Sequence, residues 1–181
     1  MSGPTSSMAR RSLAGAVLSV TVVGSALLTA APGHSAAIDC RGVPATIIGT
    51  TGADVLIGTD GRDVIVSLAG KDTVTSLGGK DLVCGRRGAD TVDTGAQPDR
   101  VIGGGGADVV NGERGRDKLI GSAGDDSLTG SRGQDTIKGG GDDDLMFGDD
   151  AVDALTGGNG ADTANGGAEI DICDAEVIID C

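Results

Sequence analysis

Residues 103–111 read GGGGADVVN, and this stretch is one unit of a repeat that fills most of the chain. Written in rows of nine from Ile48, the sequence keeps one register to Cys173 without insertion or deletion, which gives fourteen rows. The seventh position of a row is Asp in all fourteen, although Asp fills only 21 of these 126 positions. A period of nine therefore organises residues 48–173.

The positions around this Asp predict how each row folds. Position two is Gly in eleven rows, position five is Gly in ten, and position nine is apolar or Cys in all fourteen. Each row thus indicates a Gly-rich turn that ends in Asp, followed by a three-residue strand whose middle residue points inward. Such strands must stack on one another. We expect an all-β solenoid in which two rows close one coil, so that fourteen rows make seven coils.

The composition agrees with a thin core. The 181 residues include one Phe, no Trp and no Tyr, but 34 Gly. Two facing ladders of single aliphatic residues need no large aromatic side chain. Of the 27 acidic residues, 24 are Asp, which indicates that the fold uses the shorter carboxylate for a specific purpose.

The first 37 residues are typical of a secretory signal peptide. Arg10 and Arg11 precede an uncharged run over 13–31, and Pro32 and the small residues of 35–37 follow it. We expect cleavage before Ile38 and a secreted, extracellular protein, by the general or the twin-arginine route. A retained membrane anchor is the alternative, because an uncharged run of this length just spans a bilayer.

The charge excludes two classes of partner. The whole chain carries a formal net charge of −13, and after cleavage the 12 remaining basic residues against 27 acidic ones give −15. Nucleic acids and anionic membranes are therefore not expected to bind.

The row pattern resembles the G-G-x-G-x-D-x-U-x nonapeptide of the RTX, or haemolysin-type calcium-binding, family. Rows 102–110 and 156–164 match best, through the stretches GGGGADVVN and GGNGADTAN. The resemblance implies a right-handed parallel β-roll with several calcium ions held between successive turns on each edge.

The residue types suit calcium. This hard cation takes about six to eight oxygens from carboxylates and backbone carbonyls, and glycines let turn carbonyls face a common centre. The expected metal ligands are the row Asp residues Asp54, Asp63, Asp72, Asp81, Asp90, Asp108, Asp117, Asp126, Asp135, Asp144 and Asp162.

The two edges of the roll are not equivalent in sequence. Odd-numbered rows keep the Gly at position five in six of seven cases and even-numbered rows in only four, so we expect stronger calcium sites on the odd edge. Position five is Gln97, Ala151 and Glu169 in three even rows, and we expect their Asp99, Asp153 and Asp171 not to bind calcium. Three even-row Asp residues directly follow a basic residue: Arg62, Lys80 or Arg116. These basic side chains either neutralise the carboxylates in place of an ion or are ordinary solvated charges.

Four cysteines predict two disulfides in an exported chain. Cys40 and Cys84 lie near one end of the roll and Cys173 and Cys181 near the other, so we expect these two pairs. A zinc site formed by the cysteines is the alternative to disulfides, but no C-x-x-C occurs and the one His lies within residues 1–37. Segments 38–47 and 174–181 are expected to cap the calcium-binding roll of residues 48–173.

Three functions compete. We favour a calcium-stabilised structural, adhesive or calcium-sequestering protein outside the cell. Binding to a polysaccharide or to ice is the alternative, suggested by outward hydroxyls such as Thr73, Thr75 and Thr129. A polysaccharide-modifying enzyme is less favoured, because the carboxylates are equivalent and residues 38–181 lack His and Tyr for proton transfer.

Overall fold

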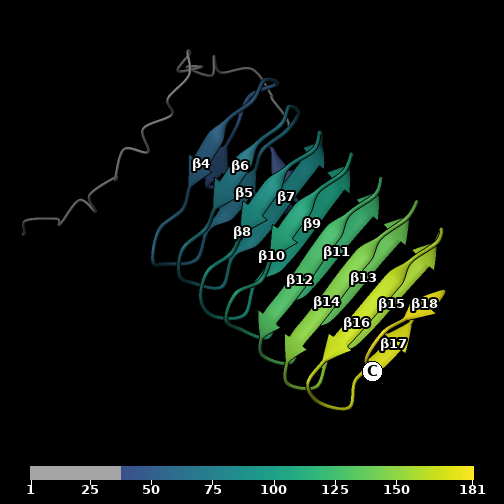
Figure 1. The fold of residues 1–181 in the computed structure, drawn as a ribbon. Helices are drawn as coiled ribbons and strands as arrows, with labels where there is room; N and C mark the ends of the chain where they lie inside the picture. Colours follow the sequence, from purple (N-terminus) through teal and green to yellow (C-terminus); the bar gives the residue numbers. More distant parts are fainter. Residues whose placement is uncertain (1–37) are drawn as a thin grey trace, which may run out of the picture.

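The computed structural model describes residues 38–181, and the expected signal peptide of residues 1–37 lies outside them. The described chain forms two eight-stranded parallel sheets that face each other (Figure 1). Successive strands alternate between the sheets, so that each pair closes one coil of a solenoid with about seven coils. The predicted β-solenoid is therefore confirmed. No helix that could cross a membrane is found in this part of the chain.

The strands have the following bounds. The first sheet contains β4 (Val55–Ile57), β6 (Thr73–Thr75), β8 (Thr91–Asp93), β10 (Val109–Asn111), β12 (Ser127–Arg132), β14 (Leu145–Asp150), β16 (Thr163–Gly167) and β18 (Val177–Ile178). The second sheet contains β3 (Ile47–Ile48), β5 (Val64–Val66), β7 (Leu82–Arg87), β9 (Arg100–Gly105), β11 (Lys118–Ala123), β13 (Thr136–Gly141), β15 (Ala154–Asn159) and β17 (Ile172–Asp174). The hairpin strands β1 (Asp39–Cys40) and β2 (Val43–Pro44) pair with each other.

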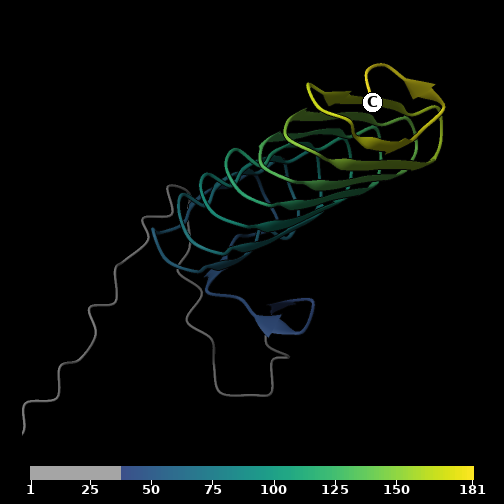
Figure 2. The same cartoon turned by 90° about the horizontal axis from the view of Figure 1, so that it is seen from below.

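The core consists of the residues at position nine, as predicted. Neighbouring strands pair exactly one coil apart in sequence, so that Val110 lies between Val92 and Leu128. The result is two facing ladders of buried aliphatic side chains. They line the inside of the flattened coil whose backbone Figure 2 shows. Each coil contributes only two such residues, and apolar burial per coil is accordingly small.

Several strands are longer than the predicted three residues. Strands β9 and β11–β15 each span six, because turn residues also pair with the next coil. In β11, Ser122 pairs with Gly140 and Ala123 with Gly141, whereas position two is skipped. Stacked turns thus hydrogen-bond to one another in the same direction as the strands. The extra pairing compensates for the thin core by adding backbone hydrogen bonds at the turns.

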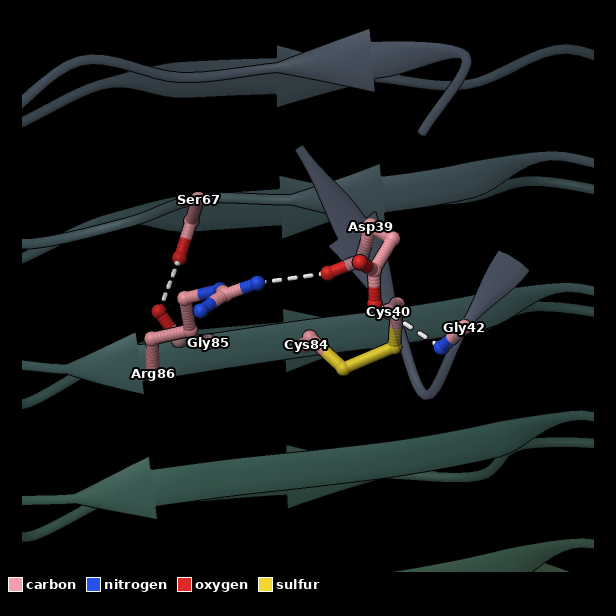
Figure 3. The surroundings of a disulfide bond; sticks show 7 residues. All are labelled: Asp39, Cys40, Gly42, Ser67, Cys84, Gly85 and Arg86. Carbon is pink, nitrogen blue, oxygen red and sulfur yellow. Dashed lines mark hydrogen bonds between the residues drawn. A yellow bond between two sulfur atoms is a disulfide. The ribbon is translucent and has the colours of Figure 1, made fainter. Parts of the chain in front are cut away.

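The hairpin β1–β2 lies against the outer face of the second sheet rather than across the end of the stack (Figure 2). Val64, Val66 and Leu82 point outward from β5 and β7, and they are buried with Cys40 and Cys84 beneath the hairpin. The Cys40–Cys84 disulfide fastens it there, and the guanidinium of Arg86 donates to the carbonyl oxygen of Asp39 (Figure 3). The apolar outer face of these coils explains why the segment packs on the side of the roll.

The C-terminal segment continues the coil. Strand β18 pairs with β16, and Glu176 accepts a hydrogen bond from the backbone N–H of Asp162, in the place that the next row Asp would occupy. The Cys173–Cys181 disulfide fastens this last part of the chain. Both disulfides thus join the cysteines that were expected to pair, and a carboxylate still follows the last Asp of one edge.

We predict that Gln97→Gly stabilises the protein. Gln97 occupies position five with a φ of 82°, where Gly79 of the preceding coil has 127°. A left-handed conformation costs a residue with a Cβ about 1–2 kcal/mol, so relief of this cost should raise the free energy of unfolding by about 1 kcal/mol in denaturant titration. The adjacent Ala96→Gly, where φ is not positive, should lower it slightly. A loss of stability in Gln97→Gly would contradict the prediction.

Candidate metal centre

The fourteen row Asp residues form two ladders, one along each edge of the roll. All fourteen side chains are buried. The odd-edge ladder consists of Asp54, Asp72, Asp90, Asp108, Asp126, Asp144 and Asp162. The even-edge ladder consists of Asp63, Asp81, Asp99, Asp117, Asp135, Asp153 and Asp171. Because each Asp directly precedes a strand, the stacking of strands also aligns the carboxylates.

Twelve of the fourteen ladder carboxylates are held by the backbone of the preceding coil. The N–H of each Asp donates to Oδ1 of the Asp 18 residues later, as from Asp108 to Asp126 at 2.8 Å. The same bond recurs in twelve successive pairs with lengths of 2.7–3.0 Å. The Asp side chains are therefore rigid parts of the fold, oriented before any ligand arrives.

The second carboxylate oxygen, Oδ2, is mostly left without a partner. Within residues 38–181 it is buried and makes no hydrogen bond in eleven of the fourteen residues: Asp72, Asp81, Asp99, Asp108, Asp117, Asp126, Asp135, Asp144, Asp153, Asp162 and Asp171. A buried charged oxygen without a donor is costly, and a native protein places a cation or donor beside it. These atoms mark where a positive ligand is needed.

The glycine at position two leaves room for such a ligand. A Cβ added at Gly112 would lie 2.8 Å from Oδ2 of Asp117 and 2.9 Å from the carbonyl oxygen of Gly130 in the next coil. At Gly130 the corresponding distances are 2.5 Å to Asp135 and 3.0 Å to the Gly148 carbonyl. A carboxylate and a carbonyl oxygen thus converge on one point beside both glycines. This donor set fits calcium, which prefers hard oxygens of both kinds.

Backbone oxygens are needed to complete any metal site. In the described ranges, no three side chains of His, Cys, Asp or Glu come close enough together to hold an ion. A cation at the ladders would take carboxylates from successive coils and carbonyls from the turns. The arrangement differs from a closed cage of side chains, because each site shares its residues with its neighbours along the edge.

The ladder carboxylates are poorly solvated when no cation is present. Burial raises the pKa to about 7 for Asp99, Asp117 and Asp126, and to about 6 for Asp108, Asp144 and Asp153. The backbone hydrogen bond from the preceding Asp lowers the pKa in each case, and the charge of neighbouring carboxylates raises it. The metal-free edge therefore holds protons close to neutral pH.

The structure gives the three Asp residues left out by sequence reasoning the same environment as the others. Asp99, Asp153 and Asp171 are buried in the even-edge ladder, and each has an Oδ2 without a donor. Row six keeps the usual turn bonds despite Gln97, whose N–H donates to the Arg114 carbonyl oxygen. Position five therefore does not distinguish these three carboxylates from the others in burial, and their role in calcium binding stays a prediction.

Fold and ladders together define the class: a parallel β-solenoid whose turns present buried carboxylates one coil apart. The comparison with protein families matches the RTX calcium-binding nonapeptide repeat in four copies, over residues 47–83, 85–119, 120–155 and 150–173. The chain belongs to this family of calcium-binding repeats. A search of curated proteins found no match.

We predict that the metal-free protein loses stability as the pH rises. Asp99, Asp117 and Asp126 have folded-state pKa values of about 7, above the ordinary 3.8. The folded state thus binds protons that the unfolded state releases, and this contribution is complete below about pH 4 and lost as the pH passes through about 7. Thermal melting in metal-free buffer should show a lower Tm at pH 8 than at pH 5.5. A Tm that is constant or higher at pH 8 would contradict this prediction.

Proposed function

We propose that the protein is a secreted calcium-binding β-roll that calcium stabilises, with a structural, adhesive or calcium-sequestering role outside the cell. The observation that carries the proposal is the set of buried Oδ2 atoms without donors, eight of which lie beside a glycine at position two. Ladder carboxylates on both edges, including those of Asp153 and Asp171, would hold several ions together with turn carbonyls. Calcium would supply the positive charge that the edges lack.

An extracellular location suits both the ion and the cysteines. Two disulfides are present among the described residues, and disulfides persist in oxidising compartments. Extracellular fluids contain enough calcium to fill weak sites. The signal peptide expected over residues 1–37 would deliver the chain to that compartment.

We propose no catalytic role for the roll. Acid–base catalysis needs two groups whose surroundings set their pKa values apart. The ladder residues instead repeat one environment from coil to coil, each with the same hydrogen bond to Oδ1. Such equivalence suits the binding of many similar ions.

We predict a large difference in stability between calcium-loaded and metal-free protein. Circular dichroism and thermal melting of residues 38–181 should show more β-structure and a higher Tm in calcium, because ion binding offsets the repulsion along each ladder. Asp126→Asn should lower the free energy of unfolding in calcium by about 2 kcal/mol, which is the typical contribution of a charged contact. In metal-free buffer the same substitution should raise the Tm, because it removes one repelling charge.

Asp60→Asn is the matched control, because Asp60 is exposed and outside the ladders. It should leave both melting temperatures nearly unchanged. Identical spectra and melting temperatures with and without calcium would refute the proposal.

A second candidate function, binding of an acidic polysaccharide, is favoured by one surface depression. It encloses about 550 Å³ beside the β1–β2 hairpin. Four basic residues line it, together with the apolar Val43 and Leu82: Arg41, Arg62, Lys80 and Arg100. Among the residues described, none of the four forms an ion pair, and Nε of Arg100 is buried without an acceptor. Asp81 also borders the depression, but its carboxylate belongs to the even-edge ladder.

We predict that dextran sulfate binds here, and uncharged dextran does not, when both are titrated at constant calcium concentration. Arg62→Gln combined with Lys80→Gln should weaken binding at least about tenfold, because two charged contacts are lost. Lys71→Gln combined with Arg114→Gln removes the same charge from exposed positions outside the depression and should have little effect. Equal weakening by both pairs would indicate only a general charge effect, and binding of free phosphate alone would exclude a polysaccharide site.

A further inference from the structure

The residue at position two divides the roll along its length. In rows seven to fourteen it is Gly without exception: Gly103, Gly112, Gly121, Gly130, Gly139, Gly148, Gly157 and Gly166. In rows one to six, three of the six are hydroxyl residues, namely Ser67, Ser76 and Thr94. All three side chains are completely buried. They therefore occupy the space beside the ladders that the glycines of the later rows leave open.

Each of these hydroxyls donates to the carbonyl oxygen of position two in the next coil. Ser76 Oγ lies 2.8 Å from the carbonyl oxygen of Thr94, and Thr94 Oγ1 lies 2.9 Å from that of Gly112. Ser67 Oγ lies 2.8 Å from the Gly85 carbonyl oxygen and 3.5 Å from Oδ2 of Asp90 (Figure 3 shows the bond to Gly85). In the glycine rows the same kinds of oxygen converge on the point beside the glycine. The hydroxyl thus stands where a cation would otherwise be needed.

The three hydroxyls fill the space beside the ladders without donating to every neighbouring carboxylate. Ser76 and Thr94 donate their hydrogens to carbonyl oxygens, and Oδ2 of Asp72, Asp81 and Asp99 has no donor.

In the first two rows, a threonine of the same turn donates hydrogen bonds to the row carboxylate. Oδ2 of Asp54 accepts from the N–H of Thr50 at 2.6 Å and from its hydroxyl at 3.0 Å. Oδ2 of Asp63 accepts from the N–H and hydroxyl of Thr59 at 2.7 and 2.9 Å. Three carboxylates of rows one to six therefore have a donor at Oδ2, whereas none of the eight in rows seven to fourteen has one.

The same early coils carry the strongest additional support. The Cys40–Cys84 disulfide and the apolar cluster of Val64, Val66 and Leu82 lie over rows two to five. Within the described chain, the only other disulfide is Cys173–Cys181, which closes a short segment of the last row and tail. Covalent and apolar stabilisation are thus concentrated in the early coils, outside the rows that all have glycine at position two.

From these observations we infer that the roll has two parts with different metal requirements. Residues 48–101 form a base that folds without calcium, in which hydroxyls take the place of ions. Residues 102–173 contain the calcium sites and stack onto this base when the ion binds. The inference rests on the proposed calcium function and specifies where it acts. A folded base removes the cost of starting a solenoid, since each later coil needs only a preformed neighbour.

Hydrogen exchange of residues 38–181, followed by mass spectrometry in metal-free and in calcium buffer, tests the inference. Strand amides in 48–101 should be protected in both buffers, and those in 102–173 only in calcium. Loss of protection along the whole roll without calcium would overturn the two-part division while leaving the calcium function standing. Exchange that is insensitive to calcium everywhere would refute both.

Substitutions at position two test the role of the hydroxyls. Ser76→Gly combined with Thr94→Gly should make protection of residues 48–101 depend on calcium and should increase the number of bound ions. Thr75→Gly is the control for the flexibility of an added glycine, because Thr75 neighbours Ser76 but lies at position one on the outer face. The same calcium dependence in Thr75→Gly would count against the hydroxyls.

The reverse change extends the base by one step. Gly112→Ser would continue the hydroxyl series of Ser76 and Thr94, and the nearest atoms to its Cβ are at 2.8 and 2.9 Å, among the least crowded of the later rows. Such contacts require a small shift of the Asp117 carboxylate. We expect one bound ion fewer, together with gained protection near this coil in metal-free buffer. An unchanged ion count would contradict the assignment of that site.

Discussion

Repulsion between carboxylates stacked one coil apart is the constraint on which the rest of this structure depends. Two unit charges about 5 Å apart repel by about 1 kcal/mol in water and by about 3 kcal/mol at an effective dielectric constant near 20. Each edge repeats this contact from coil to coil, with every carboxylate buried and all but the first on each edge fixed by the N–H of the preceding row Asp. The thin aliphatic core adds only two side chains per coil. Proton uptake, hydroxyl donors and calcium are three ways of relieving the same repulsion.

Most of the architecture could be predicted from the sequence, because one register runs through fourteen rows. That register alone places Val110 inward and Asp108 at the edge, and it brings the cysteine pairs close together. The side-packed hairpin was not predicted, since a cap at an end and a cap on a side bury similar segments. Its signal lay in Val64, Val66 and Leu82, which face outward from β5 and β7 and would be exposed without a cover.

The details of the metal centre were less accessible to sequence reasoning. Position five departs from the family pattern in several rows, yet Gln97 adopts a positive φ, as Gly79 does in the preceding coil. Position two has a more direct effect on the surroundings of the carboxylates than position five, since its side chain points at the ladder. Only the hydrogen bonds of Ser67, Ser76 and Thr94 show this, and a three-dimensional structure is needed to see which oxygens they reach.

The alternation of strands between two sheets has a consequence for how such a chain changes in length over evolution. A strand pairs with the strand 18 residues away, and the nine-residue neighbour belongs to the opposite sheet. Gain or loss of 18 residues keeps every later strand in its own sheet, whereas a change of nine would exchange the two edges for the remainder of the chain. The heritable unit of growth is therefore the pair of rows.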